Sequence, residues 1–99
     1  MNFLRDDYKY TYISSATTTT VTGNTTVPVT GKLIRITLTE TAAGAITIYD
    51  AVAGSTTATI GAMKASIAEG TYDYGVTFSR GLQIVTAGAS KLTVVWTTV

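Results

Sequence analysis

Hydrophobic and polar residues alternate with a period of two along almost the whole chain, as in β-strands that bury one face. The one stretch with helical character, residues 63–70, is too short for an independent helix, so an extended or one-turn connection is expected there. Alternating and threonine-rich stretches predict about seven to eight short strands, with Pro28 placing residues 27–29 at a sheet edge or a strand end. The stretches are residues 8–14, 17–22, 32–40, 45–50, 56–63, 71–78, 82–86 and 92–98, and residues 27–29 are a further edge strand or the end of a strand.

The same alternation assigns inward and outward positions, because successive side chains of a strand point to opposite faces. The residues expected to point inward from residues 32–40 and 92–98 are Ile34, Ile36, Leu38, Leu92, Val94 and Trp96. The outward residues of the first of these stretches are Arg35, Thr37 and Thr39. Two apolar runs flank AGAS between Gly81 and Trp96, which predicts a closing hairpin with Leu82 and Ile84 in the core and Gln83 facing water or a neighbour.

Turn signals recur roughly every 8–12 residues, which is typical of a β-sandwich or a small barrel. No internal repeat or linker divides the chain, and its 99 residues suffice for one core. The sequence therefore predicts an all-β fold: a single antiparallel β-sandwich of jelly-roll type over residues 8–99, preceded by an N-terminal arm over residues 1–7.

The amino-acid composition indicates that the outward faces of the strands carry few charged residues. Charged residues make up 13% of the chain and hydrophobic residues 45%, whereas an average soluble domain has about 25% charged residues. Threonine, which is β-branched and tolerates water, fills about a fifth of the chain. A surface with so little charge repels copies of itself weakly, as is typical of proteins that live inside assemblies.

Several function classes are disfavoured by the residues that the sequence lacks. There is no histidine and no cysteine, which removes the commonest general base, thiol chemistry and the commonest metal ligands. The net charge is +1 and the lysines are dispersed, so no basic stripe for nucleic acid is expected. No apolar run approaches the roughly 18 residues of a membrane span. We expect no enzyme, no cofactor, no metal, no nucleic-acid partner and no membrane partner.

Four aspartates are candidates for catalysis or metal binding. Asp6 and Asp7 could form a hydrolytic pair or a calcium site, but a solvated or salt-bridged arm is favoured because further oxygen ligands are absent around them. Asp50 and Asp73 flank tyrosines, where turn capping or simple exposure is the expected role.

Tyrosines and the N-terminal tip form the candidate site of this sequence. Tyr8, Tyr10 and Tyr12 share one face of a strand, and Tyr72 and Tyr74 share one face of another. Each stripe is open to two interpretations, a packing or subunit interface, which is favoured, and a platform on which sugars stack. The apolar tip that contains Phe3 and Leu4 is either an anchor that extends onto a neighbouring subunit or a frayed end.

From Gly31 onward the chain resembles a family of small phage virion proteins built as jelly-roll-like β-sandwiches. The segments that carry the resemblance are GKLIRITLTE, GAITIYDAVAG with its Tyr49–Asp50 pair, FSRGLQIVTAG and KLTVVW. The resemblance implies a structural part of a viral particle, namely a capsid decoration (cement) protein or a head-fibre or tail-surface component, and usually a homotrimer. It covers about two-thirds of the chain and leaves the role of residues 1–30 open.

These observations together lead to an expected function without catalysis. The chain is expected to be a capsid decoration protein that binds the assembled shell as a homo-oligomer, with itself and the major capsid protein or another virion protein as partners. It lacks the apolar segment of a signal peptide at its start, so synthesis in the host cytoplasm and residence in the virion are expected. The alternative is a carbohydrate- or receptor-binding module of a phage tail or fibre.

Overall fold

The computed structural model describes residues 8–23, 27–55 and 58–98, and within these ranges the chain is built of β-strands without helices. There are eight strands: β1 (Lys9–Ile13), β2 (Thr18–Thr22), β3 (Gly31–Glu40), β4 (Ile46–Asp50), β5 (Thr59–Met63), β6 (Gly70–Phe78), β7 (Leu82–Thr86) and β8 (Lys91–Thr98). The predicted all-β class is confirmed.

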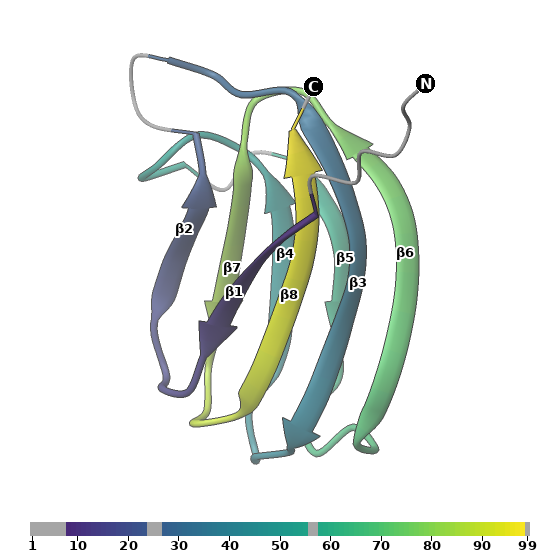
Figure 1. Cartoon of the computed structure of the whole chain (residues 1–99). Helices are drawn as coiled ribbons and strands as arrows, with labels where there is room; N and C mark the ends of the chain where they lie inside the picture. Colours follow the sequence, from purple (N-terminus) through teal and green to yellow (C-terminus); the bar gives the residue numbers. More distant parts are fainter. Residues whose placement is uncertain (1–7, 24–26, 56–57, 99) are drawn as a thin grey trace.

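The strands form two antiparallel sheets of four strands, in the orders β1-β8-β3-β6 and β2-β7-β4-β5 (Figure 1). Only β4 and β5 are joined as a hairpin, and every other connection passes from one sheet to the other. Eight strands wound in this order over two sheets make a jelly roll. The prediction of a single antiparallel sandwich of jelly-roll type is therefore confirmed.

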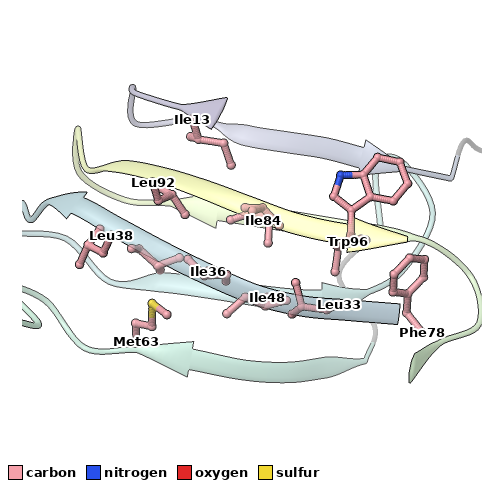
Figure 2. Packing of buried hydrophobic residues seen from close by; sticks show 13 residues of the cluster. Ile13, Leu33, Ile36, Leu38, Ile48, Met63, Phe78, Ile84, Leu92 and Trp96 are labelled. Atoms are coloured by element: carbon pink, nitrogen blue, oxygen red, sulfur yellow. The ribbon is translucent and has the colours of Figure 1, made fainter. Parts of the chain in front are cut away.

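One continuous hydrophobic core fills the space between the sheets (Figure 2). Trp96 and Phe78 close one end of this core, and Leu38 and Met63 lie toward the other end. The central residues Ile36 and Ile48 come from opposite sheets and are fully buried. Each buried side chain of this size stabilises the fold by roughly 1.5–3 kcal/mol, so the alternation seen in the sequence is the main source of stability.

The inward assignment of β3 was wrong at one residue because this strand contains a β-bulge. Leu33 pairs with Trp96 and Arg35 pairs with Val95, so Ile34 and Arg35 together oppose a single residue of β8. The extra residue changes the alternation, and Leu33 becomes fully buried while Ile34 is only partly buried. The other inward assignments of this stretch, Ile36 and Leu38, are confirmed.

The predicted closing hairpin is instead an arch between the two sheets. β7 pairs with β2 and β4, whereas β8 pairs with β1 and β3. The connection is held against the β3–β4 turn, because Ala87 N donates to Ala45 O at 3.0 Å and a Cβ on Gly44 would lie 2.3 Å from Gly88 N. Leu82 and Ile84 thus face β8 across the core rather than pairing with it, and both are buried as expected.

Two connecting segments, residues 27–30 and 64–69, lie before β3 and between β5 and β6. Residues 27–30 form no strand and lead into β3, and Val29 N donates to Arg80 O at 2.9 Å, so residues 27–29 are neither an edge strand nor the end of a strand. Residues 64–69 turn the chain between β5 and β6, with Ile67 N donating to Lys64 O at 3.2 Å, as the one-turn prediction required. The predicted arm over residues 1–7 lies outside the described residues.

Candidate functional site

The first tyrosine stripe lies on the outer face of the β1-β8-β3-β6 sheet. Tyr10 pairs with Val95 and Tyr12 pairs with Thr93, both of which alternate with the buried residues of β8. The exposed fractions are 75% for Tyr10 and 54% for Tyr12. Tyr8, which precedes β1, is also exposed at 54%. We call this outer side of the β1-β8-β3-β6 sheet the tyrosine face.

Register places further side chains beside these tyrosines in two rows that cross all four strands. The rows run in the strand order β1, β8, β3, β6 and consist of Tyr10, Val95, Arg35, Asp73 and of Tyr12, Thr93, Thr37, Thr71. The Oγ1 atoms of Thr37 and Thr71 lie 3.3 Å apart. The largest side chains of these rows are the two tyrosines of β1 and Arg35 of β3, and the residues at the β6 end, Asp73 and Thr71, are smaller than the tyrosines.

Charges on the tyrosine face are few and mostly lie in opposite-sign pairs. Arg35 Nε lies 3.7 Å from Asp73 Oδ1, with 40% and 85% of the two side chains exposed. Lys91 Nζ lies 3.3 Å from Glu40 Oε1 at the end of the same sheet. Exposed pairs of this kind contribute at most about 1 kcal/mol each. Lys32, which pairs with Thr97 and Thr77, is a further exposed charge on the same face.

The second tyrosine stripe points the other way, toward the core. Tyr72 pairs with the fully buried Ile36, and its hydroxyl donates to Ala68 O. The ring of Tyr74 lies so close to Gly61 of the opposite sheet that a Cβ there would be 3.3 Å from Tyr74 Cε2. Burial raises the pKa of Tyr74. Tyr72 and Tyr74 thus close the side of the sandwich between the edge strands β5 and β6, and they do not share a face with Tyr10 and Tyr12.

The outer face of the other sheet differs from the tyrosine face, and here a sequence-based expectation was wrong. Gln83 alternates with Leu82 and Ile84, as expected, but its side chain is fully buried instead of facing water or a neighbour. Its Oε1 accepts from Thr20 Oγ1 at 2.9 Å, and its Nε2 donates to Ala51 O at 3.2 Å. The residues that follow β4 therefore cover this position, and the chain satisfies the buried amide itself.

The remaining candidates for chemistry have structural roles. The Asp50 carboxylate accepts from Ser79 N at 3.1 Å, Ser79 Oγ at 3.3 Å and Arg80 N at 2.9 Å, so it caps the β6–β7 turn as expected. Lys9 Nζ lies 5.8 Å from the centroid of the Trp96 ring, and Trp96 Nε1 donates to Thr11 Oγ1 at 3.2 Å. These contacts join the inward side of the edge strand β1 to the core.

Sequence analysis did not identify the neighbours of the tyrosine stripe. Arg35 and Thr37 were placed outward, but nothing in the sequence put them in the same rows as Tyr10 and Tyr12. The missing information is strand pairing, since β1 reaches β3 only through β8, the last strand of the chain. Phe3 and Leu4, which also belong to the predicted site, lie outside the described residues.

Within residues 8–23, 27–55 and 58–98, no pocket and no cluster of three or more potential metal ligands is found. The same part of the chain contains no helix long and apolar enough to cross a membrane. What the described residues do present is the tyrosine face, an open, weakly charged surface on a rigid sheet. The chain matches no known family model, no curated protein and no solved structure.

Proposed function

We propose that this chain is a structural protein of a phage particle, a capsid decoration protein that binds the assembled shell as a homo-oligomer. The observation that carries the proposal is the tyrosine face, where Tyr10 and Tyr12 are exposed among threonines and paired charges. Tyrosine and arginine are enriched in protein interfaces, while unpaired lysine and glutamate are depleted there. A jelly roll alone does not specify a function, so the phage context comes from the resemblance of residues 31–96.

The proposed action is mechanical. A protein that binds the assembled shell more tightly than loose shell subunits stabilises the assembled state by mass action. Such a protein needs a rigid scaffold, a surface with complementary shape and no reacting group. The continuous core supplies rigidity, and the tyrosine face supplies aromatic contact area with hydroxyl groups at its edge.

The N-terminal tip belongs to the same proposal. Phe3 and Leu4 precede β1, and an apolar segment at that point of the chain could add a strand or an anchor to a neighbouring subunit. The resemblance leads us to expect three copies in the oligomer, with the major capsid protein or another virion protein as the second partner.

Co-sedimentation tests this function directly. Shells of the phage whose genome encodes the chain are purified without it, mixed with increasing amounts of the protein and pelleted. We expect saturable binding in a fixed ratio to the shell subunits and a higher temperature of shell disruption. A chain that lacks residues 1–7 should stay folded and bind more weakly. A protein that remains in the supernatant at every concentration would contradict the proposal.

A second candidate function is supported by the exposure of the stripe itself. A tyrosine that is 75% exposed on a flat sheet can stack on a sugar ring, and the neighbouring Thr93 and Arg35 offer hydrogen-bonding groups. In that case the chain is a carbohydrate- or receptor-binding module of a tail or fibre. A glycan array distinguishes the two functions, because saturable binding that Tyr10→Ala abolishes would favour the module.

A further inference from the structure

We propose that the tyrosine face pairs with the same face of a second copy of this chain, around a two-fold axis parallel to the strands. The inference deepens the proposed function by assigning the tyrosine face to self-association, which leaves contact with the shell to other surfaces, and it rests on that function only in requiring copies to associate. It does not require a shell. It gives a pair where the resemblance implies three copies, and the mass in solution distinguishes the two. Three features support the pairing: the openness of the face, the difference in side-chain size between its edge strands and the positions of its charges.

The tyrosine face is exposed to solvent, whereas the outer face of the other sheet contains a fully buried side chain. On the β2-β7-β4-β5 sheet, the described chain buries Gln83 completely with its own loop and hydroxyl contacts. On the tyrosine face, no described residue covers Tyr10 or Tyr12. Large exposed aromatic groups that are neighbours on one rigid surface mark an interaction site more often than isolated ones do.

The difference in side-chain size between the edge strands β1 and β6 favours one symmetry. A two-fold axis that lies in the interface and runs along the strands reverses the order of the strands but keeps each row at its height. The large residues of β1 then lie over the small residues of β6 in the other copy. Tyr10 meets Asp73 of the second copy and Tyr12 meets Thr71 of the second copy, because these residues end the same rows. Gly75 adds open space on β6, since a Cβ there would meet nothing within 4 Å.

The charges fit the same arrangement. Asp73 has 85% of its side chain exposed and only a 3.7 Å contact with Arg35 Nε, so its carboxylate keeps acceptor sites for a tyrosine hydroxyl. In the middle of that row, Arg35 lies over Val95 of the second copy, where its planar group can cover an apolar side chain. The Arg35 residues of the two copies lie on either side of the axis, and each keeps Asp73 of its own copy beside it.

The area of the face predicts the strength of the pairing. Four strands spaced about 4.8 Å apart and about 20 Å of usable strand length give roughly 400 Å² per copy, or roughly 800 Å² for the two copies. This is below the area of stable interfaces, so weak association between the micromolar and millimolar ranges is expected. Two sheets can stack in this way about 10 Å apart with strands inclined by about 30°, as they do inside sandwiches.

A charge-swap experiment tests the pairing. The molecular mass in solution is measured by sedimentation from micromolar to millimolar protein for four samples: the unchanged chain, Tyr10→Glu, Asp73→Lys, and a mixture of the two variants. Thr18→Glu, an exposed position on the outer side of the other sheet, is the matched control. Thermal unfolding of each variant verifies that it remains folded, which exposure of the changed residues leads us to expect.

The expected result is a pair for the unchanged chain and for Thr18→Glu. Tyr10→Glu should raise the dissociation constant about tenfold or more, because it brings two negative groups together. Mixing it with Asp73→Lys should restore a pair of mixed composition. A monomer at all concentrations, a trimer that Tyr10→Glu leaves unchanged, or a mixture without mixed pairs would overturn the inference. So would a monomer that binds a neutral polysaccharide through Tyr10. The proposed function fails separately, if shells do not bind the protein in co-sedimentation.

Discussion

The two outer faces of the sandwich follow the same alternation and end in different environments. In the β2-β7-β4-β5 sheet, the row through β7 joins Thr20, Gln83 and Tyr49, and the central amide is fully buried. In the β1-β8-β3-β6 sheet, the corresponding row begins with Tyr10, which is the most exposed large hydrophobic residue described. Alternation thus tells which side of a sheet a residue occupies, but not whether that side meets water.

The difference arises from the segment that follows β4. This segment lies beside β2 and β7 at one end of the sandwich (Figure 1). Ala51 N donates to Gly81 O at 3.2 Å, Ala51 O accepts from Gln83, and Ala51 is fully buried. The chain itself therefore covers Gln83 on one outer face, whereas Tyr10 and Tyr12 on the other face stay exposed.

The largest effect is expected from changing Gly81, which lies close to the backbone of both Thr22 and Ala51 on the outer side of the β2-β7-β4-β5 sheet. A Cβ on Gly81 would lie 2.5 Å from Thr22 O and 2.6 Å from Ala51 O, so Gly81→Ala must push β7 away from both. We expect a loss of about 3 kcal/mol in the free energy of unfolding, measured by urea denaturation. Gly54→Ala is the control, because its Cβ would contact nothing and only its φ of 82° is unfavourable. That variant should lose about 1 kcal/mol. Equal losses in both variants would contradict the steric explanation.

A smaller effect is expected from removing the buried amide of the covered face. Gln83→Ala leaves Ala51 O without its donor and opens a cavity, so the free energy of unfolding should fall by about 2 kcal/mol. Tyr10→Ala is the matched change on the open face and should cost less than about 0.5 kcal/mol in dilute protein. Denaturant midpoints of the two variants measure the contrast between the faces. If Tyr10→Ala proved as destabilising as Gln83→Ala, the tyrosine face would be part of the monomer's own packing.

Much of the fold follows from local pattern, and the exceptions have identifiable causes. Period-two alternation and glycine turns predicted the strands and the sandwich, because one buried face per strand is enough to require two packed sheets. The bulge at Ile34 was not predictable, since an extra residue leaves the hydrophobic pattern KLIRI ambiguous between Leu33 and Ile34. The sequence AGAS does not distinguish an arch from a hairpin, because both connections are short and rich in small residues.

The candidate site was predictable in its residues but not in its orientation. In β1 the tyrosines form one side, and Lys9, Thr11 and Ile13 form the other, so neither side is purely apolar. The second side faces inward because Ile13 fills the core, Thr11 accepts from the Trp96 indole and Lys9 lies over its ring. Long-range contacts with the last strand of the chain therefore decide which aromatic stripe remains open.

The smallest effect concerns the contrast between an inward and an outward tyrosine hydroxyl. Burial raises the pKa of Tyr74 in the folded protein. The unfolded chain therefore loses this proton first, from a pH of about 10. Because the folded state then holds more protons than the unfolded state, the free energy of unfolding falls as pH rises through the folded-state pKa. Tyr74→Phe should lose less stability than the unchanged chain between neutral and strongly alkaline pH.

Urea denaturation across this pH range measures that difference between inward and outward hydroxyls, with Tyr10→Phe as the control because Tyr10 lies on the open face. Below pH of about 9 the hydroxyl is neutral in both states, so the stability difference between Tyr74→Phe and the unchanged chain should be independent of pH there. Above that range, Tyr74→Phe should remove more of the alkaline loss than Tyr10→Phe does. Identical pH profiles for the unchanged chain and Tyr74→Phe would mean that water reaches the Tyr74 hydroxyl freely, and that Gly61 and Tyr74 do not close the side of the sandwich.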